Sequence, residues 1–286
     1  MKRVLAILIT LLPIIAMSQV RVASAAKTEK KVVPYDSISN NPKDPYGLVG
    51  QELFLLPKPE QLRQFEYDIY PSDQLTGKKP SYESVAMHTF EVVEVIKQES
   101  RFSSKDVLKL RDLKTDSIYY IKYEKRESLW PYLILGYKSK FEAENKGKKF
   151  HVLLSHLRNF DTGDKIEKSR GSVWTFQEII ALEDRGEIGY LFQNSNGETV
   201  ALTKLDMDHF IFPKSRMDQL IKKYGQAMCN TALAGEIKIG MPKELVKVAW
   251  GEPDRINDSS YSEQWVYGET HISCVYFKNG KVSGWN

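Results

Sequence analysis

The sequence predicts an α+β protein in which two small β-rich units precede a C-terminal module of helices and antiparallel strands. Short runs of alternating apolar residues, separated by turn formers, fill the part of the chain before residue 213. The order of these runs recurs once along the chain. After residue 213, apolar residues follow one another at helical steps, and short strands then end the chain.

The N-terminus has the pattern of a secretory signal peptide. Lys2 and Arg3 precede an apolar run from Val4 to Met17, and Ala23-Ser24-Ala25 supplies the small residues of a cleavage site. The apolar run is too short to span roughly 30 Å of hydrocarbon, which argues against a membrane anchor. We therefore expect residues 1–25 to be removed on export to the periplasm or the extracellular space, leaving no integral membrane segment. No cysteine lies beside the cleavage site, so a lipoprotein is not expected.

The charge of the exported chain is close to neutral. The signal peptide holds three basic residues and no acidic one, so 38 of the 41 basic residues remain against 37 acidic residues. Near-neutral, evenly mixed charge gives no electrostatic reason to expect a nucleic-acid partner.

The first β-rich unit is expected at residues 47–125, after a polar segment, 26–46, that has the composition of a flexible tether. Its strands are predicted at Gly50–Pro57 and His88–Gln98, and then on both sides of a polar turn at Lys114–Asp116.

The connector, residues 126–144, is aromatic and apolar. It carries Trp130, Tyr132 and Tyr137. Two interpretations are open: these side chains pack one unit against the other, or they form an interaction surface for a partner.

The second β-rich unit, residues 145–212, repeats the order of the first. Gly147–Leu154, Trp174–Leu182 and Ile188–Leu205 follow one another as the strands of the first unit do, and a Thr-Phe pair recurs in the second strand. The alternative is that any two runs of strand, turn and strand look alike. About five short strands in each unit is the number found in a small SH3-like barrel.

One triplet and the histidines are candidates for chemistry. Asp161-Thr162-Gly163 matches the catalytic triplet of aspartic proteases, but that mechanism needs two carboxylates, and the same residues are typical of a turn. His151 and His156 are spaced so that they cannot face one metal from a strand or a helix, and His88, His209 and His271 are isolated. The sequence therefore indicates no catalytic residues, no cofactor and no metal site.

Cys229 and Cys274 are the only cysteines. In an exported protein they are candidates for one disulfide, which would stabilise the fold by about 4 kcal/mol in the chain-entropy model. The alternative is two free, buried thiols.

The C-terminal module, residues 213–286, is predicted to begin with an amphipathic helix over Ser215–Gly235 that bends at Gly225. A shorter helix follows, starting at Pro242 and stopped by Gly251. Three antiparallel strands then end the chain.

The last two strands are predicted to form a hairpin. Asn279-Gly280 indicates a two-residue type I′ turn, which places Phe277 opposite Val282 and Cys274 opposite Trp285.

Residues 235–286 resemble a known family. The runs IGMPKELVKVAWGEPDRIN, SEQWVYG and VYFKNGKVSGW are similar to the SmpA/OmlA family of BamE-like outer-membrane assembly proteins. The resemblance implies two helices against a three-stranded antiparallel sheet, and a non-enzymatic interaction module of the cell envelope. Pro242 departs from the Ser or Thr cap usual in the family, and the lipoprotein cysteine of the family is missing.

These observations predict an exported, non-catalytic binding or scaffold protein that acts through an envelope protein partner. A module that binds cell-wall glycan, with peptidoglycan as its partner, is the first alternative, and a secreted hydrolase is the second.

Overall fold

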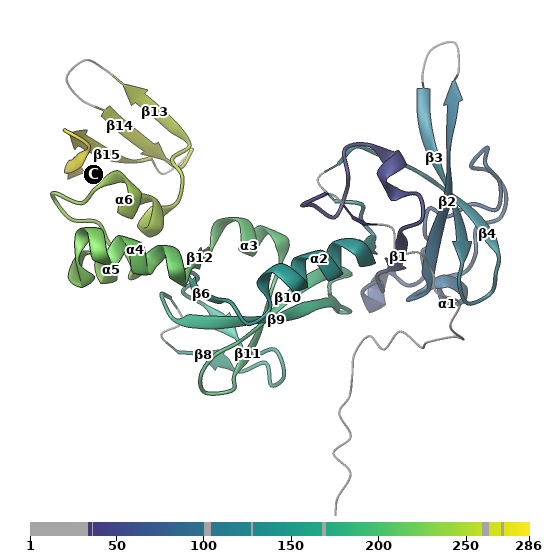
Figure 1. The fold of residues 1–286 in the computed structure, drawn as a ribbon, viewed down its shortest axis with the longest axis horizontal. Coiled ribbons are helices and arrows are strands. Elements are labelled where there is room, and N and C mark those ends of the chain that lie inside the picture. The colour runs from purple at the N-terminus through teal and green to yellow at the C-terminus, as the bar shows by residue number, and fades with distance from the viewer. Residues whose placement is uncertain are drawn as a thin grey trace, which may run out of the picture. The chain divides into compact units, whose positions relative to one another are not determined.

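The computed structural model describes residues 34–35, 37–99, 104–126, 128–167, 170–258, 263–269 and 272–286. The predicted signal peptide and residues 26–33 lie outside them. In the described residues, helices accompany sheets whose strands all pair antiparallel, so the predicted combination of helices and antiparallel sheets is confirmed (Figure 1).

The first β-unit is a five-stranded sheet with the order β4-β3-β2-β1-β5. A long segment between its first two strands contains the short helices η2 (Glu60–Leu62) and α1 (Tyr82–Val85), and η1 (Pro45–Leu48) precedes the sheet. The strands are β1 (Glu52–Leu55), β2 (Thr89–Glu99), β3 (Ser104–Asp112), β4 (Ile118–Lys122) and β5 (Tyr132–Ile134).

The second β-unit has the same strand order, β11-β10-β9-β6-β12. The segment between its first two strands forms a small hairpin of β7 (Leu157–Arg158) and β8 (Lys165–Ile166), and α3 (Lys204–His209) precedes the last strand. The strands of the sheet are β6 (Lys149–Val152), β9 (Val173–Leu182), β10 (Glu187–Gln193), β11 (Thr199–Leu202) and β12 (Ile211–Pro213).

The two sheets also match in detail. The second strand of each sheet has a bulge, at Val93 in β2 and at Gln177 in β9. The registers make Phe90 equivalent to Trp174, because these residues pair with the equivalent residues of β1 and β6. The matching of Thr-Phe to Thr-Phe was therefore two residues out of register, although it kept the same face of the strand.

A glycine with a positive φ begins each sheet. Gly50 has φ 80° and donates its N–H to Val92 O, while Gly147 has φ 79° and donates to Phe176 O. Both acceptors immediately precede the bulge of their strand. The equivalent chain reversals therefore use the residue type that adopts this conformation at least cost.

Each fifth strand continues directly into a helix of 11 residues. These helices are α2 (Leu135–Asn145) and α4 (Lys214–Tyr224). The sequence did not predict either fifth strand, because three-residue strands show too little alternation to detect. The buried apolar side chains of both β-units form one continuous core cluster.

Part of the predicted tether is packed against the first β-unit. Tyr35, Asn40 and Asn41 are buried. Asn40 donates its side-chain N–H to Tyr132 O and accepts from Ile134 N, so its amide pairs with the edge of β5 as a backbone group would. The prediction of a flexible segment was wrong around Asn40 and Asn41, because their side-chain amides bond to the backbone of the first β-unit and of the chain that follows β4.

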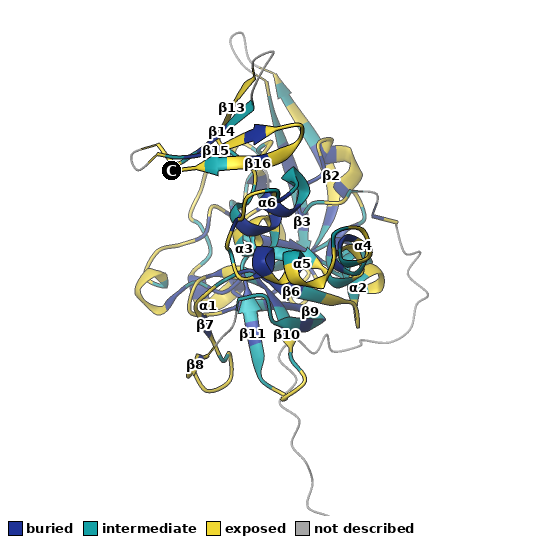
Figure 2. Cartoon of the chain, turned by 90° about the vertical axis from the view of Figure 1, so that its left-hand side faces the viewer, coloured by how far each residue is buried: buried dark blue, intermediate teal, exposed yellow. Residues whose placement is uncertain are grey.

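The C-terminal module has its own core cluster, in which α6 is largely buried (Figure 2). Its sheet has four strands, one more than predicted, in the order β13-β14-β15-β16. Its further elements are α5 (Gln226–Leu233), α6 (Lys243–Trp250), β13 (Arg255–Asp258), β14 (Glu263–Tyr267), β15 (Ser273–Lys278) and β16 (Lys281–Trp285).

The helix boundaries follow the predicted glycines. The first helix begins at Lys214 and is interrupted at Gly225, which has φ 84°, so α4 and α5 are separate. Pro242 caps α6 and Gly251, with φ 85°, ends it. Leu245 and Val246 are both fully buried, so both anchor α6.

The last hairpin contains a bulge that the sequence did not reveal. Asn279 and Gly280 both have positive φ, as a type I′ turn requires, and Phe277 pairs with Val282. The extra residue then shifts the pairing, so that Trp285 lies opposite Val275 and not opposite Cys274.

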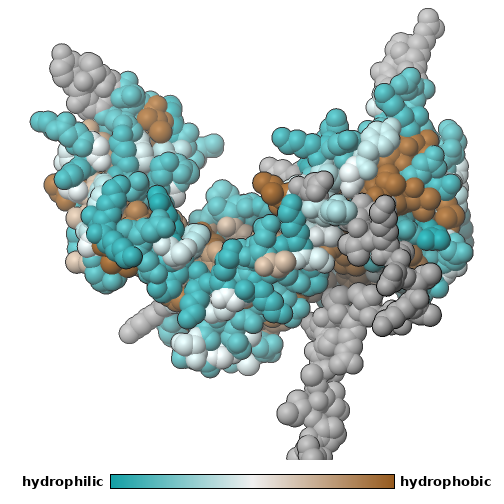
Figure 3. Space-filling model, in the orientation of Figure 1, coloured by the Kyte–Doolittle hydropathy of each residue, from teal (hydrophilic) through white to brown (hydrophobic). Residues whose placement is uncertain are grey.

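None of the helices in the described part of the chain has the length and apolar character needed to cross a bilayer. Figure 3 shows a largely hydrophilic face, with hydrophobic side chains gathered over the first β-unit.

Candidate functional site

The predicted aromatic surface of the connector is not a single surface. Trp130 is 59% exposed and donates its indole N–H to Gly186 O. Tyr132 and Tyr137 are buried, and the Tyr137 hydroxyl lies 2.8 Å from that of Tyr190 in β10. Burial raises the pKa of Tyr137, so its hydroxyl stays protonated. The packing interpretation of the connector therefore agrees with the structure, and the interaction-surface interpretation fails for both tyrosines.

The Asp161-Thr162-Gly163 triplet forms a turn in the hairpin of β7 and β8. Asn159 Oδ1 accepts hydrogen bonds from the N–H groups of Asp161 and Thr162, and Gly163 has φ 77°. The exposed Asp161 carboxylate accepts from the hydroxyl of Thr199 at 2.6 Å. The turn interpretation of this triplet is confirmed.

The cysteines are both buried and both free. Cys229 belongs to the core cluster that contains Trp265 and Val275. Cys274 pairs with Val266, so it points to the opposite face of the sheet from Trp265 and Val275. The sheet thus separates the two thiols. The structure agrees with the alternative of two free, buried thiols and not with a disulfide.

His151 and His156 have different surroundings. His151 is buried and lies 2.8 Å from Gly171 O, whereas His156 is exposed. His209 ends α3. His271 lies outside the described residues.

His88 belongs to a buried polar network that the sequence did not reveal. Its Nδ1 lies 2.8 Å from Asp112 Oδ2, and its Nε2 lies 3.2 Å from Lys114 Nζ. Because an ammonium group only donates, Nε2 accepts and the proton lies on Nδ1. Asp112 also accepts from Lys114 N and from the hydroxyl of Thr115.

The equivalent turn in the second β-unit shows which part of this network builds the hairpin. There Asn194 Oδ1 accepts from Asn196 N at 2.9 Å, as Asp112 Oδ1 accepts from Lys114 N at 2.8 Å. The turn is therefore made by Asp or Asn alone. His88 adds a buried hydrogen bond to the turn in the first β-unit, and no hydroxyl or thiol nucleophile bonds to His88 in the described residues.

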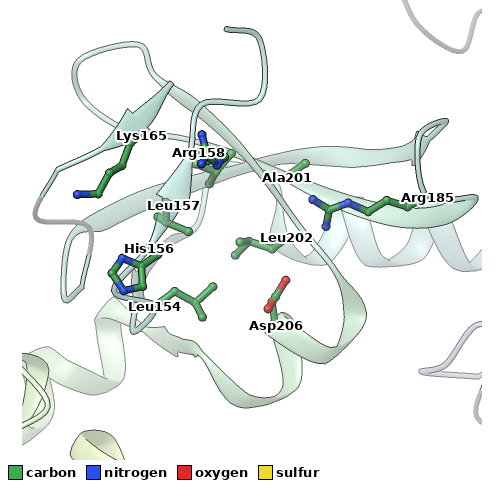
Figure 4. Close-up of a pocket in the computed structure, with 10 residues that line it drawn as sticks. Leu154, His156, Leu157, Arg158, Lys165, Arg185, Ala201, Leu202 and Asp206 are labelled. Atoms are coloured by element: carbon green, nitrogen blue, oxygen red, sulfur yellow. The ribbon is translucent and has the colours of Figure 1, made fainter. Parts of the chain in front are cut away.

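The strongest candidate for a ligand site is a basic groove in the second β-unit (Figure 4). Three chain segments distant in sequence build it: the chain from the end of β6 into β8, the turn between β9 and β10, and the chain from β11 into α3. Its volume is about 440 Å³. The lining residues are Leu154, His156, Leu157, Arg158, Lys165, Arg185, Val200, Ala201, Leu202 and Asp206.

The floor of the basic groove is apolar. Leu157, Val200 and Leu202 are largely buried and belong to the core cluster of the β-units, so they are held in place by packing. This floor provides a surface on which the apolar part of a ligand can pack.

The rim of the basic groove carries positive charge. Arg158, Lys165 and Arg185 are exposed, and Asp206 is the only acidic residue among those that line the groove. Outside the lining, Glu167 pairs with Lys165 at 2.9 Å and Asp184 with Arg185 at 3.5 Å, so the positive charge of the rim is partly balanced. Arg158 donates to Gly163 O, an uncharged acceptor. The side chain of Arg185 extends toward the middle of the groove in Figure 4. An anionic group would be attracted to this rim, and more strongly at low salt.

The single lining carboxylate has a structural role. Asp206 Oδ2 accepts from the N–H and the hydroxyl of Thr203, which caps α3. Capping residues of this kind hold the start of a helix in place. Asp206 therefore fixes α3 at one end of the basic groove while only partly reducing its positive charge.

A second cleft, of about 640 Å³, lies in the first β-unit. It is larger, but basic and acidic side chains alternate in it. Lys122 pairs with Glu124 at 3.0 Å, and Asp44 and Asp106 also line it. Its lining has four basic and three acidic side chains, whereas the lining of the basic groove has three basic and one acidic, and we therefore favour the basic groove.

Sequence reasoning missed the basic groove because no local motif encodes it. Its basic residues are separated along the chain and meet only when β7, β8 and the turn before β10 are placed by the sheet. Comparisons of the chain with protein-family models, with curated proteins and with solved structures found no significant match.

Proposed function

We propose that this chain is an exported, non-catalytic binding protein of the cell envelope, and that the basic groove of the second β-unit is its binding site for an envelope protein partner. The observation that carries this proposal is the combination of a fixed apolar floor with a rim of exposed basic side chains. Such a groove fits a ligand that joins an apolar side chain to a negative charge.

The fold supports a binding role in two ways. Each β-unit has five antiparallel strands in one order, which supports an SH3-like barrel, a fold that other proteins use to bind peptides in surface grooves. The C-terminal module places helices against an antiparallel sheet, which agrees with a BamE-like module. Its fourth strand and its divided first helix are departures from the family pattern. The signal-peptide pattern of residues 1–25 supports export.

The test compares two charge-reversed proteins of equal net charge. Arg158→Glu with Arg185→Glu reverses the rim of the basic groove, and Lys222→Glu with Lys278→Glu makes the same change on exposed positions outside it. The tagged proteins are incubated with envelope extract, and the bound proteins are measured by quantitative mass spectrometry.

We expect a specific partner bound by the wild type and by the control pair, and lost from the groove pair. Binding that is equal for both pairs would show that the basic groove is not the site. If the wild type captures no partner at low or moderate salt, the proposal of a protein partner fails.

Binding to cell-wall glycan is the second candidate, and the same basic rim favours it if the wall polymer carries carboxylate groups. Sedimentation with purified peptidoglycan separates the two candidates. Co-sedimentation of the wild type that is lost in the groove pair would favour the wall ligand over the protein partner.

A further inference from the structure

The edge strands β4 and β11 occupy equivalent places in their sheets. Val92 and Phe176, the residues just before the two bulges, pair with Leu110 and Phe192. On the other side, Leu110 pairs with Tyr119 and Phe192 pairs with Val200, so Tyr119 and Val200 are equivalent. The next residues, Tyr120 and Ala201, are therefore equivalent.

The backbone N–H and C=O groups of Tyr120 and Ala201 point outward from the edge of their sheets, away from the neighbouring strand. In the second β-unit, Asn194 N donates to Glu198 O, so these two residues form a hydrogen-bonded pair. Pairs with and without mutual hydrogen bonds alternate along antiparallel strands. Leu191 and Ala201, three pairs further on, are therefore a pair without mutual hydrogen bonds. Thr199, two residues before Ala201, accepts at its carbonyl from Phe160 N, which confirms the direction. The N–H and C=O of Ala201 thus face the basic groove, which Ala201 lines.

In the first β-unit this edge is already occupied by the chain itself. Tyr70 donates its N–H to Tyr120 O at 2.9 Å and accepts from Tyr120 N at 2.8 Å, as one antiparallel bridge. Ile69, next to it, is fully buried in the core cluster. Asp68 pairs with Lys79 at 2.7 Å.

In the second β-unit, no backbone hydrogen bond from outside the sheet reaches Ala201 within the described residues. The segment between β6 and β9 bonds to the edge of β11 only at Thr199 O, through Phe160 N, within the described residues. Thr199 lies two residues before Ala201, the equivalent of the Tyr120 to which Tyr70 bonds in the first β-unit. The edge of β11 at the basic groove is thus open where the edge of β4 is closed.

We propose that the partner enters the basic groove as an extended peptide that adds one antiparallel step to β11, bonding Ala201 N and O as Tyr70 bonds Tyr120. This inference deepens the proposed function and rests on it, because it names the partner class of the same groove. Strand addition of this kind gives affinity through the backbone and selectivity through the side chains.

The side chains of the groove define the sequence of the peptide. The residue beside the bridge points to the floor of Leu157 and Leu202, so it is apolar, as Ile69 is in the first β-unit. A flanking acidic residue meets Arg158 or Arg185. The segment Asp68-Ile69-Tyr70 of this chain has that pattern, so a peptide of residues 66–72, EYDIYPS, is a suitable probe.

The experiment measures binding of the fluorescent EYDIYPS peptide to the full exported chain by anisotropy. One peptide carries an N-methyl group at the residue equivalent to Tyr70, which removes the N–H that bonds Ala201 O and leaves every side chain in place. A control peptide carries the N-methyl group at the residue equivalent to Ile69, whose N–H points away from the edge. Ala201→Pro removes the protein's own outward N–H, at an edge position where proline is tolerated.

We expect the parent and control peptides to bind alike, and the first N-methyl peptide and Ala201→Pro each to weaken binding by about tenfold, as loss of a hydrogen bond in a desolvated groove predicts. Equal binding of both N-methyl peptides would overturn strand addition while leaving the basic groove as a site. Because the N-methyl comparison needs no protein variant, it stands even if Ala201→Pro misfolds.

Failure of the parent peptide to bind, with the envelope partner still captured by the wild type and lost from the groove pair, would overturn this inference alone. Failure of both would overturn the proposed function as well.

Discussion

Replacing Asp112 tests whether the buried polar network of the first β-unit stabilises the fold. Asp112 is fully buried and accepts from His88 Nδ1 at 2.8 Å, from Lys114 N at 2.8 Å and from the Thr115 hydroxyl at 3.0 Å. In Asp112→Ala the buried His88 donor loses its partner, which costs about 1–3 kcal/mol, whereas water can reach the exposed turn and satisfy part of the rest. We expect a total loss of about 2–4 kcal/mol of unfolding free energy.

The assay is urea unfolding of the exported chain, read at equilibrium with the slope of the transition compared between variants. Asn194→Ala removes the equivalent turn residue of the second β-unit, which has no histidine partner, and we expect it to cost about 1 kcal/mol. Equal losses for Asp112→Ala and Asn194→Ala would refute the reasoning that the His88 bond adds to the turn.

The same network predicts a dependence on pH. Burial disfavours the Asp112 carboxylate, but the hydrogen bonds from His88, Lys114 and Thr115 outweigh this effect and lower the pKa of Asp112 below its usual value. A pKa lower in the folded than in the unfolded chain means that the stabilisation is present above the unfolded pKa, near 4, and is lost as pH falls through the folded pKa. The stability difference between the wild type and Asp112→Asn should therefore be constant above about pH 5 and shrink below about pH 4. A difference that stays constant in acid would contradict this assignment.

Three further predictions concern the core. Cys229 and Cys274 should remain unbonded in the exported chain, so its mass should be the same under reducing and non-reducing conditions. Burial raises the pKa of Cys229, and this thiol should react with thiol reagents only when the chain unfolds. A mass lower by two hydrogens under non-reducing conditions would contradict the separation of the thiols by the sheet. Leu245→Ala should lower the unfolding free energy by about 3 kcal/mol, because Leu245 is fully buried in the core of the C-terminal module; a cost below about 1 kcal/mol would show that α6 is not anchored there. Tyr137→Phe and Tyr190→Phe should each cost about 1 kcal/mol, and the double variant less than their sum, since the two hydroxyls bond to each other; additive costs would contradict that bond.

The sequence predicted the parts of the fold that depend on local signals. The break at Gly225, the end of α6 at Gly251 and the turn at Asn279-Gly280 all occur at residues with a positive φ, which glycine and asparagine adopt most readily. Strand pairs with clear alternation, such as β3 and β4, were also correct.

The errors came from interactions between distant residues. Asn40 looked like part of a flexible segment, but its amide satisfies the edge of β5. Tyr137 looked like a surface aromatic residue, but it is buried against Tyr190. Bulges such as the one at Gln177 shift a register without leaving a sequence signal.

The candidate site could not be predicted from the sequence for the same reason. Arg158, Arg185 and Ala201 have no common motif and meet only through the strand order of the second β-unit. The internal repeat was the useful signal, because comparison of Tyr120 with Ala201 shows which edge is open.

The most direct test of the central claim is amide hydrogen exchange at Tyr120 and Ala201, with and without the EYDIYPS peptide. In the free chain the Tyr120 amide should be protected, because it donates to Tyr70 O, and the outward Ala201 amide should exchange freely. Saturating peptide should slow exchange at Ala201 by at least about tenfold and leave Tyr120 unchanged. An Ala201 amide that still exchanges freely when the peptide is bound would contradict the claim that the partner pairs with the edge of β11.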